Sequence, residues 1–408
     1  MTACCRCRIC GGNAQQFLDL GRQPLSNTFR APDTTDSEYS FTLKVCRCDN
    51  CGMVQLVDEV PRDEMFTAHY PFFTSSSTHM TEHFTRTAHR LCEQYCSDVD
   101  PFVIEIGAND GTMLSTFAKA GIRHLGVDPA GIPGERAAER GVLMLHDFFE
   151  QRTAVTIRAE HGPADLVFAA NTLCHIPYLD DVFRGIDTVL SNSGVFIFED
   201  PYIGDIISRT AFDQIYDEHF YFFSATTVDL MAHNWGFELI DIDRFGVHGG
   251  EVRYTLARKG RRARKDAVDM HIRHELALGL GTFDVFAAFA DRVRDRRDRL
   301  VDMLYSLTSS GKSIAGYAAT AKSATLLNYC GIGPNLLPVI YDTTPEKQGL
   351  LTPGSHIPVA AFPGPDDKLP DVYLLLAWNH AEEIITKEDT FRKSGGRWLH
   401  YVPDVMLK

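Results

Sequence analysis

Four cysteines near the N-terminus occur in two closely spaced pairs. Cys7 and Cys10 form the first Cys-x-x-Cys pair, and Cys48 and Cys51 form the second. This spacing is typical of a structural zinc site, in which four thiolates surround the ion tetrahedrally. A glycine directly follows each pair and permits the tight turn that brings both thiolates to one ion. The pattern predicts a four-cysteine zinc site with no open coordination position for substrate or water.

The remaining N-terminal cysteines leave alternatives open. Cys46 competes with Cys48 as a ligand, Cys4 and Cys5 precede the first pair, and unrelated free thiols are the alternative to a metal site. We expect a cytoplasmic protein, because the first ten residues lack an apolar signal region and no apolar run approaches the ~18 residues that span a bilayer. Thiols stay reduced in that compartment, so we expect no disulfide framework.

A glycine-containing loop lies between a predicted strand and a predicted helix. Its sequence is Glu105-Ile-Gly107-Ala-Asn109-Asp110-Gly111. The pattern is close to the Glu-x-Gly-x-Gly-x-Gly loop of S-adenosylmethionine (SAM) methyltransferases, in which glycines let the cofactor approach the backbone. Asn109 replaces the central glycine, and asparagine tolerates left-handed geometry better than most residues. We expect this loop to bind the cofactor.

Further acidic and aromatic residues extend the expected cofactor site. Asp128 ends the second predicted strand, where it could accept both ribose hydroxyls, and Asp147 and Phe148 could hold an adenine edge and face. NAD sites also combine a glycine-rich loop with an acidic residue that binds the ribose, so these loops favour SAM without excluding NAD. A doubly wound domain with an acidic turn is the alternative to either cofactor.

Candidates for a general base follow two later strands. Asn171 and His175 come after one strand, and Tyr216, Glu218 and His219 cluster after the next. Ligands of open α/β sheets bind at the carboxyl ends of strands, and a phenol, an acid and an imidazole together can tune a base. The alternatives are a structural histidine and a polar helix terminus.

The positioning elements are short apolar runs that alternate with helical stretches. This alternation predicts parallel βαβ sheets, one in the middle of the chain and one at its C-terminal end. A helix is predicted at 80–95, before the first sheet, and another at 283–307, between the two sheets. A basic run at 258–265 is interpreted as a solvated linker rather than an RNA contact. The predicted strands are 102–106, 125–127, 166–169, 195–198, 238–243 and 251–257, then 313–318, 337–341, 372–377 and 397–401.

The predicted fold class is therefore α/β. It comprises an N-terminal zinc-binding lobe at 1–68, a central Rossmann-like SAM methyltransferase domain at 69–260, linker helices at 261–310 and a second Rossmann-like domain at 311–408. The 408 residues carry 54 acidic and 40 basic side chains, a net charge of −14, which argues against a general nucleic-acid binder.

Seven segments together resemble the zinc-containing deoxysugar C-methyltransferases. The resemblance covers essentially the whole chain and is most specific for the C-3′ branch of tetronitrose and kijanose type, which acts on TDP-3-amino-2,3,6-trideoxy-4-keto sugars. One departure is Ala108, where relatives are expected to carry cysteine. The segments are 7–12, 20–26, 48–56, 105–111, 170–177, 216–220 and 316–325.

This resemblance implies SAM-dependent methylation of C-3′ through proton abstraction next to the ketone, an enolate and methyl transfer. Because these side chains cluster, we hypothesise that Tyr216 or His219 removes the C-3′ proton, that Glu218 orients or charges that pair, and that His175 faces the 4′-oxygen. Tyr70 would close the site from the N-terminal side.

We expect the C-terminal domain to help bind the TDP group of the substrate. Lys322 and Ser323 lie at a strand–helix turn suited to a pyrophosphate, and Tyr341, Asp342 and His380 follow other strands. The alternative is a scaffold without ligand. The expected partner is thus a TDP-linked amino keto deoxysugar, with neither nucleic acid nor membrane, and a monomer is the working expectation.

Two other functions remain open at this point. One is a SAM-dependent O- or N-methyltransferase that acts on another small molecule or on RNA. The other is a zinc-containing binding protein whose Rossmann domains no longer catalyse.

Overall fold

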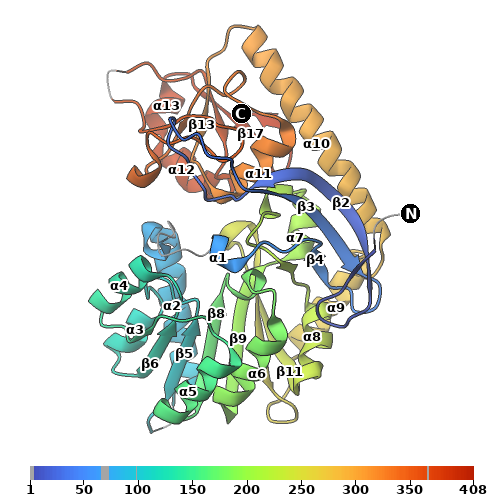
Figure 1. Ribbon diagram of the computed structural model, residues 1–408, viewed down its shortest axis with the longest axis vertical. Helices are drawn as coiled ribbons and strands as arrows, with labels where there is room; N and C mark the ends of the chain where they lie inside the picture. Colours follow the sequence, from blue (N-terminus) through green and yellow to red (C-terminus); the bar gives the residue numbers. More distant parts are fainter. Residues whose placement is uncertain (1–3, 66–72, 98, 365–366) are drawn as a thin grey trace.

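The computed structural model describes residues 4–65, 73–97, 99–364 and 367–408, and their strands form three β-sheets (Figure 1). The fold is α/β, with an N-terminal cysteine-rich lobe and two Rossmann-like sheets, which confirms the predicted fold class. No helix in the described ranges is long and apolar enough to cross a membrane.

The N-terminal lobe contains an antiparallel sheet in the order β1-β2-β3-β4-β10. Four strands come from the N-terminal region, whereas β10 follows His219 in the range predicted for the central domain. The lobe is therefore completed by a strand from the domain that it covers. Its elements are β1 (Cys4–Arg6), β2 (Asn13–Pro24), β3 (Ser40–Cys48), β4 (Val54–Leu56), α1 (Arg62–Met65) and β10 (Tyr221–Phe222).

The central sheet has the order β11-β12-β9-β8-β5-β6-β7. Strands β5 to β9 are parallel, and β12 and β11 close the sheet as an antiparallel pair. The strand order reverses between β5 and β8, which creates the switch point where ligands of such sheets bind. The strands are β5 (Phe102–Ile106), β6 (Arg123–Val127), β7 (Met144–Leu145), β8 (Ala164–Ala170), β9 (Leu190–Pro201), β11 (Phe237–Phe245) and β12 (Glu251–Arg258).

Helices flank this sheet. All five residues of β5 are buried, which explains why the strand is a continuous apolar run apart from Glu105. The α-helices of the domain are α2 (Thr78–Tyr95), α3 (Leu114–Lys119), α4 (Gly131–Glu139), α5 (Gln151–His161), α6 (Leu179–Val189), α7 (Ile203–Arg209) and α8 (Ala225–Ala232).

Two helices connect the central and C-terminal domains, α9 (Asp266–Ala277) and α10 (Asp284–Ser309). The basic run that precedes them is exposed but not a free linker. Arg264 forms an ion pair of 2.6 Å with Asp229, and Lys265 pairs with Asp241. Acidic partners on the central domain thus hold the segment, a feature that local charge counting could not predict.

The C-terminal sheet has the order β15-β14-β13-β16-β17-β18, parallel except for β18. Its switch point lies between β13 and β16. The elements are β13 (Ile314–Tyr317), α11 (Ala321–Cys330), β14 (Ile340–Tyr341), β15 (Val359–Ala360), β16 (Val372–Leu375), α12 (Ala381–Lys387), α13 (Asp389–Lys393), β17 (Arg397–His400) and β18 (Met406–Leu407).

The carboxyl edges of the two parallel sheets face each other. Trp378, after β16, donates from Nε1 to Asp213 Oδ2 of the central domain at 2.7 Å. Lys322, in the first turn of α11, donates from Nζ to the His248 carbonyl at 3.4 Å. Strand β2 packs against α10 and α11 beside this junction (Figure 1). The three parts of the molecule therefore meet around the segment 213–219.

Candidate active site

The two cysteine pairs converge as predicted. One Sγ atom from each of Cys7, Cys10, Cys48 and Cys51 lies within 4.8 Å of the other three. The Sγ–Sγ distances are 3.6 Å for Cys7 with Cys51 and 3.4 Å for Cys10 with Cys48. Four converging thiols are the donor set that a tetrahedral zinc ion requires, and they leave no position for a substrate.

Cys46 is not a ligand in this arrangement. It forms a disulfide with Cys5, which was not expected, and it lies outside the group of four. The competition between Cys46 and Cys48 is thereby resolved in favour of Cys48. The difference arises because β1 and β3 flank β2, which brings two strands far apart in the sequence within reach of each other.

The glycine-containing loop after β5 adopts left-handed geometry at three positions. The φ angles are +71° at Gly107, +48° at Asn109 and +68° at Gly111. A Cβ atom at Gly107 would lie 2.2 Å from the Thr172 hydroxyl oxygen, so only glycine fits there. The Gly107 amide donates to the Val127 carbonyl and the Asn109 amide to Asp128, which holds the loop against the end of β6, and Asn109 takes the left-handed geometry as predicted.

Two acidic side chains at this edge fit a SAM molecule. Glu105 is buried, and its Oε2 atom has no hydrogen-bond partner among the described residues. Burial, together with Asp110 and Asp128, raises the pKa of the Glu105 carboxyl well above its usual value. Asp128 accepts one backbone amide on each oxygen, from Asn109 and Ala130 at 2.8 Å, so a second lone pair on each remains for a ribose hydroxyl.

Three other side chains that were predicted to contact the cofactor make contacts within the protein. Asp110 accepts hydrogen bonds from the Ser75 amide and the Thr112 hydroxyl. Asp147 accepts the Phe148 amide at 2.8 Å, and the Arg62 guanidinium lies 4.2 Å from the centroid of the Phe148 ring. These contacts give Asp110 a loop-bracing role that its sequence context did not reveal. Asn171 is also a predicted cofactor contact, and its backbone amide donates to the Glu199 carbonyl near the end of β9.

Buried charges that the sequence did not single out lie beside Asn171. Glu199 pairs with His83 at 2.9 Å and with Arg253 at 2.8 Å. One oxygen of Glu251 lies within 4.8 Å of ligand atoms on His83 and Glu199. Burial is the main cause that raises the pKa of Glu251 well above its usual value. Glu251 follows a turn rather than a strand, which is why its position at this edge escaped detection.

Three rings lie against one another at the junction: His219 stacks on His175 and is tilted against Tyr216. The centroid of His219 lies 5.1 Å from that of His175 and 4.1 Å from that of Tyr216. His219 Nδ1 lies 2.8 Å from the Gln214 carbonyl oxygen. A carbonyl can only accept, so Nδ1 carries the hydrogen and Nε2 presents its lone pair. The structure therefore brings the predicted Tyr216, His219 and His175 together, with Nε2 of His219 suited to accept a proton.

The titration of these groups separates their roles. Burial lowers the pKa of His219 well below its usual value of 6.5, whereas burial followed by the nearby Glu218 raises the pKa of Tyr216 well above 10. The imidazole is thus neutral and the phenol protonated near neutral pH. His219 is the better proton acceptor of the two, and Tyr216 can donate a hydrogen bond to a developing oxyanion.

A general-base role for His219 predicts the pH dependence of the methyl transfer that the sequence resemblance implies. The neutral imidazole of His219 is lost only when the pH falls through its lowered pKa, so we expect kcat/KM for methyl transfer to stay constant from pH 7.5 down to 6.5 and to fall only below that range. A pH–rate profile with subsaturating acceptor measures this. An acidic limb centred at or above pH 6.5 would contradict the prediction.

The segment 213–219 is held by all three parts of the chain. In the N-terminal lobe, the Ser26 amide donates to Asp217 at 3.0 Å and Asn27 Nδ2 donates to Glu218 Oε1 at 2.7 Å. From the C-terminal domain, Tyr401 donates to Asp213 at 2.7 Å. Sequence reasoning missed these partners, because each contact joins residues more than 180 positions apart and no spacing rule connects them.

The five predicted substrate contacts of the C-terminal domain lie in different surroundings. Lys322 and His380 lie near the junction, and the ring centroids of His380 and His248 are 6.4 Å apart. Ser323 instead donates to the Thr320 carbonyl in the first turn of α11. Asp342 accepts hydrogen bonds from the Ala319 and Thr344 amides, and Tyr341 lines a pocket outside the junction.

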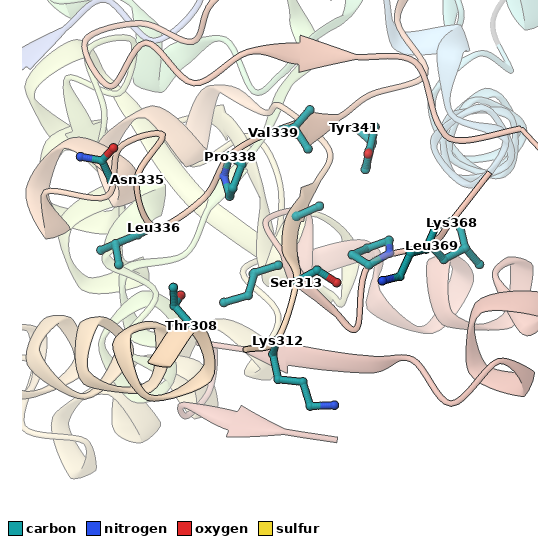
Figure 2. Close-up of a pocket in the computed structure, with 13 residues that line it drawn as sticks. Thr308, Lys312, Ser313, Asn335, Leu336, Pro338, Val339, Tyr341, Lys368 and Leu369 are labelled. Atoms are coloured by element: carbon teal, nitrogen blue, oxygen red, sulfur yellow. The ribbon is translucent and has the colours of Figure 1, made fainter. Parts of the chain in front are cut away.

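Tyr341 lines a separate pocket of about 290 Å³ (Figure 2). The pocket lies beside the start of β13, and Lys312, Ser313 and Lys368 contribute to its wall. It therefore opens at the edge of the C-terminal sheet opposite the junction. Tyr70, which was expected to close the site, lies outside the described residues.

Comparisons with known proteins match three consecutive segments of the chain. Family models match a zinc binding domain at residues 7–66, a methyltransferase domain at 76–242 and a C-methyltransferase C-terminal domain at 246–403. The C-methyltransferase NovU of Streptomyces niveus is 32% identical over 403 residues, which cover 98% of this chain and 95% of NovU.

Solved structures that match are more distant. A SAM-dependent methyltransferase from Anabaena variabilis is 16% identical, with a TM-score of 0.32 over 39% of this chain and 77% of its own. Magnesium protoporphyrin IX methyltransferase from Synechocystis, with bound SAM, is 12% identical, with a TM-score of 0.33 over 44% and 79% of the two chains.

Proposed function

The chain belongs to the C-methyltransferase family that includes NovU, and from this premise we propose that it methylates the carbon next to a ketone in a nucleotide-linked deoxysugar. The cofactor is SAM, and the four-cysteine cluster binds zinc. The proposed acceptor is a TDP-linked 3-amino-2,3,6-trideoxy-4-keto hexose, and the proposed position is C-3′. This choice of acceptor derives from the sequence resemblance described above.

The observation that carries the proposal is the ring stack of His175, His219 and Tyr216 between the two facing sheet edges. One edge carries the glycine-containing loop after β5, and the other carries Lys322. A carbon acid can therefore lie against a base, with the cofactor loop on one side and a cation on the other. Methylation of a hydroxyl would need only a base, whereas a carbanion also needs groups that stabilise its oxyanion.

The proposed reaction begins with proton transfer. His219 Nε2 takes the proton from C-3′, and the electron pair of that C–H bond moves onto the ketone oxygen as an enolate. Tyr216 and His175 face that oxygen and donate hydrogen bonds to it, while Glu218 orients the pair. SAM, when bound, supplies an electrophilic methyl group on a sulfonium, which becomes a thioether as the new C–C bond forms. The proton then leaves His219 for solvent.

Lys322 provides a test of the sugar-nucleotide site. Burial lowers the pKa of the Lys322 ammonium, and the nearby Asp213 and Glu251 carboxylates offset part of this effect. Because a hydrogen bond to a charged group contributes about 1.5–3 kcal/mol, Lys322→Ala should raise KM for the TDP-sugar roughly 10- to 100-fold.

The matched control is Lys312→Ala, since Lys312 lines the separate pocket and pairs with Asp371 at 3.3 Å. Steady-state kinetics at saturating SAM give both values. An unchanged KM in the Lys322 variant would remove this domain from the acceptor site.

The proposed function is tested with SAM labelled with carbon-13 in its methyl group and the TDP-3-amino-4-keto sugar. A product whose labelled methyl carbon couples directly to a quaternary C-3′ in the NMR spectrum supports the proposal. A labelled methyl on oxygen or nitrogen would instead support a different methyltransferase activity. Turnover of other keto sugars but not of this one would support the proposed reaction and reject the proposed acceptor.

A further inference from the structure

We propose that Asn27 of the zinc-binding lobe is a positioning residue for Glu218, and that the lobe thereby sets the geometry of the base. This inference rests on the proposed function, in which Glu218 orients Tyr216 and His219. Asn27 lies in the turn that follows β2, and its Nδ2 atom donates to Glu218 Oε1 at 2.7 Å. The two residues are 191 positions apart in the chain.

The contact belongs to a two-point attachment. The neighbouring Ser26 amide donates to Asp217 Oδ1 at 3.0 Å, and both Ser26 and Asp217 are buried. Consecutive residues of the turn thus hold consecutive carboxylates of the catalytic segment. Two adjacent hydrogen bonds fix the direction of the segment as well as its position, which one bond would not do.

A second connection runs from the zinc site to His219. Strand β4 begins three residues after Cys51, and β10 begins two residues after His219. These strands pair in antiparallel register, with Val54 opposite Phe222 and Gln55 opposite Tyr221. The Leu56 amide also donates to the Phe220 carbonyl at 3.0 Å. The zinc-binding lobe therefore holds the segment on both sides of its catalytic side chains.

The chemistry at Asn27 requires an amide. A carboxylate offers only acceptors, whereas an amide nitrogen supplies the donor that holds Oε1 of Glu218. An aspartate at position 27 would place a second acceptor, with like charge, against Glu218. Asn27→Asp should therefore be more harmful than Asn27→Ala although it is closer in shape.

The test compares Asn27→Ala and Asn27→Asp with Thr28→Val. Thr28 is in the same turn, but its hydroxyl donates only to the Leu25 carbonyl in the described structure, at 2.9 Å. We expect kcat to fall about 10-fold in Asn27→Ala and further in Asn27→Asp, with KM for SAM, zinc content and melting temperature close to those of Thr28→Val. Amide hydrogen exchange of residues 213–220 should accelerate in both Asn27 variants.

A double-mutant cycle with Glu218→Gln shows whether Asn27 acts through Glu218. We expect Asn27→Ala to lower kcat less than twofold in the Glu218→Gln background, because the group that Asn27 positions is already altered there. A full 10-fold loss there would overturn the inference. Unchanged hydrogen exchange of 213–220 in Asn27→Ala would also overturn it, and this readout needs no substrate. An inactive wild-type protein with accelerated exchange in the variants would contradict the proposed function and support the positioning role.

Discussion

His219→Asn is expected to lower the rate of methyl transfer about 10²- to 10⁴-fold, the range that a positioned general base contributes. The asparagine retains a hydrogen-bonding side chain of similar reach but cannot accept the proton. Affinity for SAM should stay at the wild-type value, because the cofactor loop at Glu105–Gly111 does not include His219. Single-turnover kinetics and calorimetric titration with SAM measure the two quantities.

The matched control is His233→Asn, since His233 is exposed at the end of α8. Adding Tyr216→Phe to His219→Asn should remove the phenol that donates to the oxyanion. A double variant that transfers methyl at nearly the wild-type rate would show that the ring stack is not the catalytic centre.

Zinc removal is expected to abolish methyl transfer while SAM still binds. Structural zinc contributes about 10–16 kcal/mol to the folding of small metal-binding domains, so the lobe cannot keep its shape without the ion. Since β4 pairs with β10 directly after His219, loss of the lobe releases one side of the catalytic segment. The cofactor loop after β5 lies on the central sheet and keeps its own support.

The experiment compares chelator-treated protein and Cys48→Ser with Cys96→Ser, a cysteine outside the cluster at the end of α2. Zinc content, methyl transfer and SAM affinity are measured on the same samples, and added zinc should restore activity to the chelated protein. Zinc-free protein with full activity would mean that the lobe has no part in positioning the base.

The strands of the two Rossmann-like sheets could be predicted because local sequence determines them. The central strand at 102–106 has the predicted limits, and α10 extends only two residues beyond the predicted end at 307. Buried parallel strands are short apolar runs, and an amphipathic helix repeats every 3.6 residues, so both signals lie within one window of sequence. The strand predicted at 337–341 was less accurate, since only Ile340 and Tyr341 pair with the neighbouring strands.

The candidate site could be predicted where it directly follows a strand, as with Gly107 and Asp128. It could not be predicted where domains meet. The side chain of Asn27 is unremarkable in the sequence, and only the folded chain places it against Glu218. The contact of the Lys322 ammonium with the central domain could not be predicted either, because it depends on how the two sheets face each other in the folded chain.

The most direct test of the account is exchange of the acceptor's C-3′ proton in deuterated water. The protein is loaded with S-adenosylhomocysteine, which lacks the transferable methyl group, and the TDP-3-amino-4-keto sugar is followed by NMR. We predict that the wild-type protein replaces the C-3′ proton with deuterium and that His219→Asn does so at least about 100-fold more slowly. Exchange at the wild-type rate in His219→Asn, or C-methylated product from a wild-type protein that catalyses no exchange, would contradict the account.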